Sequence, residues 1–173
     1  MTADPFDTLG LEPAFGLADV QIEQAYLARI ASAHPDRDAD GAAAAAALNV
    51  ARAALLSPER RANTLLARLG GPGPSDDKSL PDGFLMEMMT VRGEIEEAIA
   101  DGGDDARGEW EVWADERRAG FIERVGALFA RAQAGETPAL AKIRTELNAW
   151  RYIERLIEQL DPDYDPARAD FGP

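Results

Sequence analysis

The chain has 173 residues, enough for one ordinary domain or two small ones, and 46% of them are hydrophobic. Its net charge of −14 repels phosphate backbones, so nucleic acid is not expected as a partner. The absence of cysteine and the single histidine exclude disulfides, thiolate chemistry and multi-histidine metal sites, and no metal or cofactor is predicted.

The charge is uneven along the chain. Residues 1–70 have a net charge of −3 and residues 71–173 a net charge of −11, which indicates two parts with different partners. The first residues lack a basic stretch followed by an apolar run, and no stretch reaches the ~20 apolar residues that a membrane span needs. We therefore expect a soluble, cytoplasmic protein with no membrane partner.

Helical spacing of apolar residues runs through the whole chain, so the predicted fold class is all-α. A short opening turn or helix holds Phe6, Leu9 and Leu11. Asp19 is the expected N-cap of a helix from Val20 to Ala33, because its carboxylate can accept from a backbone N–H of the first turn. Pro35 ends that helix. Its predicted core stripe consists of Val20, Leu27, Ile30 and Ala31.

Two more helices complete the predicted first domain, residues 1–70. The alanine run 42–47 opens the first of them, which carries Leu48, Ala51, Leu55 and Leu56. Ser57-Pro58 reads as an N-cap followed by a proline in the first helical position, so another helix runs to about Leu69. Gly70-Gly71 ends it.

Residues 71–82 are rich in glycine, proline and aspartate and are the predicted linker. Three helices follow, at about 83–100, 105–134 and 137–160, with a break at Asp101-Gly102-Gly103. Short connections favour an antiparallel three-helix bundle for residues 83–173.

The only histidine lies in the tripeptide His34-Pro35-Asp36, followed by Arg37, between two predicted helices. The proline holds an imidazole and a carboxylate at one loop tip, which suits docking on another protein. Helix capping and the orientation of a general base are the alternatives that these residues leave open. No nucleophile, metal cluster or phosphate loop accompanies the tripeptide, so we do not expect an enzyme.

Residues 4–69 resemble a J-domain. Asp4-Pro5-Phe6 with Leu9-Gly10-Leu11 is similar to the opening of that fold, and Tyr26-Leu27 before the tripeptide is similar to its second helix and loop. The family uses His-Pro-Asp to stimulate a DnaK-type ATPase. The resemblance thus implies a chaperone-binding site that comprises His34, Pro35, Asp36, Arg29 and Arg37. J-domains usually carry several basic residues on the second helix, whereas this helix offers only Arg29, so attraction by complementary charge should be weak.

The helix after the linker is apolar on two sides. On a wheel of about 100° per residue, one narrow stripe consists of Phe84, Met88, Val91, Ile95 and Ile99, while Leu85, Met86 and Met89 fall on a second sector. Either the core stripe is wide, since methionine often fills gaps, or the second sector is an exposed interaction patch. Tyr152 on the last helix is an ordinary exposed tyrosine or an extension of that patch.

Phe84-Leu85-Met86-Glu87, the two-part architecture and the length together resemble the HscB-type co-chaperones of iron–sulfur cluster assembly. In that family the bundle binds an IscU-type scaffold and delivers it to HscA, a DnaK relative. By matched position, the implied scaffold-binding residues are Leu85, Met86, Met89, Glu97 and Tyr152. Thr90 and Gly93 stand where the family often has acidic residues. The alternatives are a general J-domain co-chaperone for a different client and a structural helical protein with a chance tripeptide.

Overall fold

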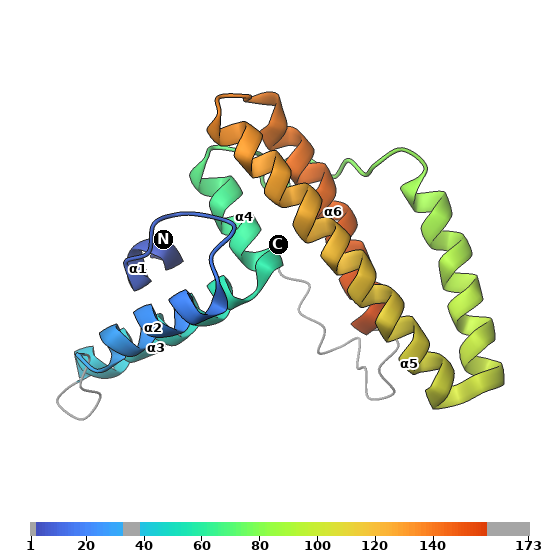
Figure 1. Ribbon diagram of the computed structural model, residues 1–173, viewed down its shortest axis with the longest axis horizontal. Helices are drawn as coiled ribbons and strands as arrows, with labels where there is room; N and C mark the ends of the chain where they lie inside the picture. The colour runs from blue at the N-terminus through green and yellow to red at the C-terminus, as the bar shows by residue number, and fades with distance from the viewer. Residues whose placement is uncertain (1–2, 33–38, 159–173) are drawn as a thin grey trace. The chain divides into compact units, whose positions relative to one another are not determined.

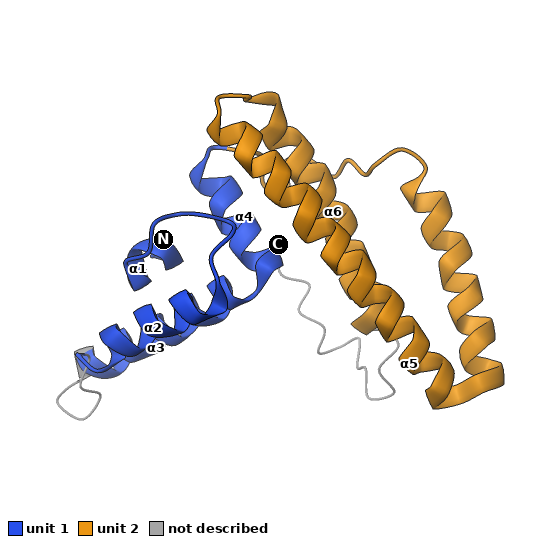
Figure 2. Cartoon of the chain, viewed as in Figure 1, with its two compact units in different colours: residues 1–70 blue, residues 71–173 orange. Residues whose placement is uncertain are grey.

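The computed structural model describes residues 3–32 and 39–158, and within these ranges the chain forms helices α1 to α6 and no strand. This confirms the predicted all-α class. Contacts divide the chain between Gly70 and Gly71 into two compact units, coloured separately in Figure 2.

Helix α1 (Pro5–Leu9) opens the first unit. The Asp4 carboxylate accepts a hydrogen bond from the Phe6 backbone N–H at 2.8 Å and so caps the helix. Gly10 ends it in the left-handed region, with φ of 65°. The positive φ of Gly10 favours glycine there, and the Arg29 guanidinium occupies the space that a Cβ would take.

Helices α2 (Asp19–Ile30) and α3 (Ala39–Leu56) pack against each other. The Tyr26 hydroxyl donates to the Asn49 side-chain oxygen at 2.8 Å, and the Arg52 guanidinium donates to both oxygens of Glu23. The hydrogen bonds from Arg52 hold the pKa of Glu23 below its ordinary value. On α3, the predicted core residues Leu48, Ala51 and Leu55 are buried.

The predicted core stripe of α2 is wrong. Ile22 is the buried residue of this helix, while Val20 and Leu27 are 60% and 59% exposed. Val20 and Leu27 are seven residues apart and share a face, but α2 turns the face of Ile22 and Tyr26 inward. The cap is also displaced by one residue: the helix begins at Asp19, and the Gln21 side chain accepts from the Ala18 N–H at 2.9 Å.

Helix α4 (Pro58–Arg68) begins as predicted, because the Ser57 hydroxyl accepts from the Arg60 N–H at 3.3 Å and Pro58 takes the first helical position. Leu65 and Leu66 are buried. At the other end of the helix, the Arg68 guanidinium donates to Asp4 at 2.9 Å and so ties α4 to the cap of α1.

The second unit consists of α5 (Phe84–Gln133) and α6 (Pro138–Glu158). Gly103 breaks α5 with φ of 56° and ψ of −127°, where residues with a Cβ are strained. Figure 1 shows the two segments of α5 and then α6 running in alternating directions. The predicted break and the three antiparallel helices are therefore confirmed.

Aromatic and aliphatic side chains from all three segments form the core of this unit. The rings of Phe121 and Trp150 stack with centroids 5.9 Å apart. Beside them, the Arg118 guanidinium donates two hydrogen bonds to Glu154, at 2.7 and 2.6 Å. The other large buried residues are Phe84, Met88, Val91, Ile95, Val125, Phe129, Ile143, Leu147, Ile153 and Leu156.

Part of the predicted linker packs on α6. The Asn148 side-chain amide donates to the carbonyl oxygens of Asp77 at 2.9 Å and Ser79 at 3.0 Å. Hydrogen bonds from Ser79 lower the pKa of the Asp77 carboxyl. Residues 77–79 are thus held by the second unit.

Candidate functional site

The first segment of α5 has two unlike faces. Met88 is fully buried, whereas Leu85, Met86 and Met89 are 53%, 77% and 69% exposed. At 100° per residue, Met86 and Met89 together point to the side of the helix opposite the buried stripe. The wide-core interpretation of these side chains is therefore wrong. We name the exposed surface formed by Leu85, Met86, Met89, Thr90, Gly93 and Glu97 the methionine face.

The polar groups at the middle of the methionine face are few and engaged. The Thr90 hydroxyl donates to the Met86 carbonyl oxygen at 3.3 Å, so its hydrogen bond is made within the helix. Gly93 is exposed and adds only backbone, and a Cβ built there would have no neighbour within 4 Å. Glu97 is exposed one turn further along.

Arginines neutralise two glutamates beside the methionine face. The Arg117 guanidinium, from the second segment of α5, contacts the Glu87 carboxylate at 2.5 Å. Arg92 donates to Glu96, four residues on, at 3.1 Å. Exposed pairs of this kind add little stability, but they reduce the negative charge around the apolar side chains.

Tyr152, on α6, packs beside the first residue of α5 rather than beside the middle of that helix. Its ring meets Phe84 edge to face, with centroids 5.7 Å apart, and the residue is half-buried. Because Phe84 directly precedes Leu85, the predicted residue Tyr152 borders the first turn of the methionine face. The structure thus gathers Leu85, Met86, Met89 and Glu97 on α5 and places Tyr152, from α6, beside the first turn of α5.

Four of the five predicted chaperone-binding residues, His34, Pro35, Asp36 and Arg37, lie outside the described residues. The fifth, Arg29, is exposed in the last turn of α2, with its guanidinium lying over Gly10.

Comparisons with known proteins separate the family from the alternatives. A family model described as the HSCB C-terminal oligomerisation domain matches residues 80–161. A co-chaperone protein HscB homolog from Bordetella pertussis is 30% identical over 168 residues, which cover 91% of this chain and 94% of the relative. The chain belongs to the HscB co-chaperone family. A further HscB homolog, from Burkholderia multivorans, is 29% identical over 90% of each chain.

Solved HscB structures share the fold. The crystal structure of human co-chaperone HscB matches 92% of this chain with a TM-score of 0.72 and 21% identity, covering 81% of the human chain. HscB from Vibrio cholerae matches 91% of this chain with a TM-score of 0.67 and 22% identity, covering 95% of its own length. An N-terminal J-domain joined to a C-terminal helical bundle is thus the architecture of this HscB-family chain.

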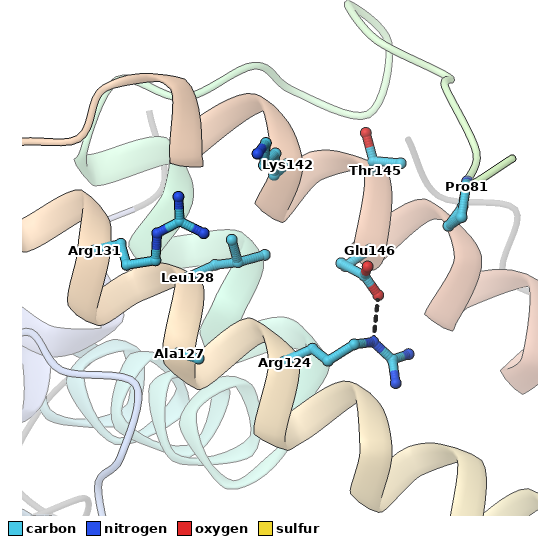
Figure 3. Close-up of a pocket in the computed structure, with 8 residues that line it drawn as sticks. All are labelled: Pro81, Arg124, Ala127, Leu128, Arg131, Lys142, Thr145 and Glu146. Atoms are coloured by element: carbon cyan, nitrogen blue, oxygen red, sulfur yellow. Dashed lines mark hydrogen bonds and ion pairs between the residues drawn. The ribbon is translucent and has the colours of Figure 1, made fainter.

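A second surface feature of the HscB bundle is a groove of about 370 Å³ between α5 and α6 (Figure 3). Its aliphatic floor is bordered by Arg124, Arg131 and Lys142, and Arg124 donates to Glu146 at 2.9 Å. None of the predicted chaperone-binding or scaffold-binding residues lines this groove. Sequence reasoning missed it because the two helices bring its residues together only in the folded bundle.

Residues 3–32 and 39–158 contain no group of three or more His, Cys, Asp or Glu side chains placed to hold a metal ion. No helix in those same ranges combines the length and apolar character needed to cross a membrane.

Proposed function

We propose that this HscB-family chain is a cytoplasmic adaptor that delivers an IscU-type iron–sulfur scaffold to an HscA/DnaK-type chaperone and stimulates the ATPase of that chaperone. Membership in the HscB co-chaperone family supports the general role. The observation that carries the scaffold assignment is the methionine face, where three large apolar side chains are exposed outside the buried stripe of the same helix.

Those three side chains have the properties of interface anchors. A helix in a folded domain normally turns its apolar residues toward the core, and a contiguous exposed group marks a binding surface. Methionine adapts its shape to a partner because its side chain is unbranched and polarizable. We assign scaffold binding to Leu85, Met86, Met89, Glu97 and Tyr152.

In this proposal the J-domain acts on the chaperone and does no chemistry itself. His34, Pro35 and Asp36 bind more tightly to the chaperone conformation that hydrolyses ATP than to the other conformation. This difference in affinity shifts the equilibrium between the two conformations. Arg29 and Arg37 contribute the few positive charges near this site.

The test is the steady-state ATPase rate of an HscA-type chaperone, with the chain and an IscU-type scaffold added separately and together. Stimulation by the chain and the scaffold together that exceeds the sum of their separate stimulations would support the adaptor. Stimulation by the chain that the scaffold leaves unchanged would indicate a J-domain co-chaperone with a different client. No stimulation at all would refute the chaperone assignment.

The Asp36→Ala variant separates the two units. It should lose ATPase stimulation while it binds the scaffold with unchanged affinity, because the substitution lies in the first unit and the methionine face in the second. Normal stimulation by this variant would contradict the role given to the tripeptide.

A further inference from the structure

The groove between α5 and α6 combines an aliphatic floor with a basic rim (Figure 3). Ala127 and Leu128 of α5 line it together with Pro81, and Leu128 is half-buried while Ala127 is exposed. Pro81 reaches this place because Asn148 holds the linker on α6 through the carbonyl oxygens of residues 77 and 79. The groove thus offers apolar surface that a further side chain can cover.

The cations of the rim keep donors for an incoming carboxylate. Arg124 donates to Glu146 through Nε alone, and its other two nitrogens make no hydrogen bond within residues 3–32 and 39–158. Lys142 forms no ion pair in that same part of the chain, while Arg131 donates to Glu136 from two nitrogens. These bonds lower the pKa of the Glu136 carboxyl, and the positive charge of Lys142 adds to the effect.

The lining of the groove is positive in a strongly negative unit. It contains three cations and one carboxylate, whereas residues 71–173 have a net charge of −11. Further carboxylates in the surrounding chain are Glu136, already paired, and Asp82 in the linker. Glu123 lies about 100° around α5 from its neighbour Arg124. Complementary charge therefore favours an occupant that pairs an apolar group with carboxylates.

A segment of this chain has that composition. Residues 161–165, which lie outside the described residues, read Asp-Pro-Asp-Tyr-Asp and place the ring of Tyr164 between the carboxylates of Asp163 and Asp165. Residues 159–173 together contain four aspartates and one arginine. A tyrosine supplies a large apolar surface, and its two acidic neighbours match the cations on the rim.

The segment is also long enough to return to the groove. Glu146 lies twelve residues before Glu158, the last residue of α6, which is about 18 Å along the helix axis at 1.5 Å per residue. Tyr164 follows Glu158 by six residues, and six extended residues span about 20 Å. A tether this short gives an effective concentration in roughly the millimolar range, so even a weak contact is populated.

We propose that residues 161–165 bind back into the groove between α5 and α6. The ring of Tyr164 covers the aliphatic floor, and the two aspartates beside it accept hydrogen bonds from Arg124 and Lys142. The groove is thus a docking site for the chain's own acidic segment. A segment of similar chemistry from another protein enters only by displacing it. The contact requires neither the chaperone nor the scaffold.

Methyl NMR spectra of the full chain test the proposal directly. Tyr164→Ser should move the signals of Leu128 and Thr145 toward those of solvent-exposed methyl groups, because both residues line the groove and lose the nearby ring. The signal of Val112, sixteen residues before Leu128 on α5, should stay in place and report an intact bundle. Phe171→Ser is the matched control, since it removes another aromatic ring of the same segment and should leave the groove signals unchanged.

The charge of the rim provides the second test. Lys142→Glu should move the groove signals in the direction of Tyr164→Ser, whereas Lys142→Arg should preserve them. Arg155→Glu makes the same kind of charge reversal at an exposed position of α6 that does not line the groove, and it should have no effect. Unchanged Leu128 and Thr145 signals in Tyr164→Ser, or signals that move with Phe171→Ser instead, would overturn the docking of residues 161–165.

Discussion

Truncation of the two most exposed methionines should separate binding from folding. A fully buried methionine side chain contributes about 1.5–3 kcal/mol relative to an exposed one. In the free chain, Met86 and Met89 still expose 77% and 69% of their surface, so a partner that covers them gains roughly 1–2 kcal/mol from each. The Met86→Ala/Met89→Ala variant should therefore lose about 2–4 kcal/mol of scaffold binding, roughly thirty-fold to several hundred-fold in the dissociation constant.

The assay pairs calorimetric titration of the IscU-type scaffold with urea unfolding of the chain alone. The double variant should keep the unfolding free energy of the unaltered chain within about 0.5 kcal/mol, as surface substitutions usually do. Met88→Ala provides the contrast, since Met88 is fully buried and its truncation should cost about 2–5 kcal/mol of stability. Val112→Ala, at an apolar position that is 61% exposed in the second segment of α5, controls for the loss of any surface side chain.

Two results would refute this reasoning. Unchanged scaffold affinity in the double variant would show that the methionine face serves another partner. A loss of stability comparable to that of Met88→Ala would show that Met86 and Met89 support the folded bundle.

Three further predictions concern the fold. Gly103→Ala should lower the unfolding free energy by about 1–3 kcal/mol in urea, because φ of 56° with ψ of −127° strains any residue that has a Cβ, and an unchanged midpoint would argue against the break at Gly103. Glu154→Ala should cost about 1.5–3 kcal/mol in the same assay, since it removes the acceptor of two short Arg118 hydrogen bonds. The pKa of Glu23 is below its ordinary value of 4.5 because Arg52 donates to it, so the pair stabilises the fold above that pH and loses this effect as the pH falls through the folded-state pKa. Glu23→Gln should accordingly flatten the acid side of the pH–stability curve, and a curve identical to that of the unaltered chain would contradict the assignment.

Local signals in the sequence predicted most of the helix boundaries. Ser57-Pro58 specified the start of α4, and the glycines at 102 and 103 marked the break in α5, because capping and positive φ depend on one or two residues. The stripe of Phe84, Met88, Val91 and Ile95 was predictable for a similar reason, because apolar residues at helical spacing leave one face for the core.

Features that depend on neighbouring helices were not predictable in the same way. Val20 and Leu27 share one face of α2, and Ile22 and Tyr26 share another. Only packing against α3 decides which of the two faces is buried. The linker residues that bond to Asn148 are 71 and 69 positions away from it along the chain. Within the methionine face, the sequence places Thr90 and Gly93, but the hydroxyl's bond to the Met86 carbonyl is visible only in three dimensions.

The methionine face also has properties that folding does not account for. Glutamate and lysine form helices about as well as methionine, so either could replace the exposed Met86 or Met89 without weakening α5, and both would make the surface more soluble. Glycine in a helix interior costs roughly 0.5–1 kcal/mol relative to alanine, and the open space around Gly93 would accept alanine. Met86, Met89 and Gly93 could thus be replaced without loss of stability, and they lie together on one face of α5. A contact outside the chain would account for their presence, as in the scaffold binding proposed for the methionine face.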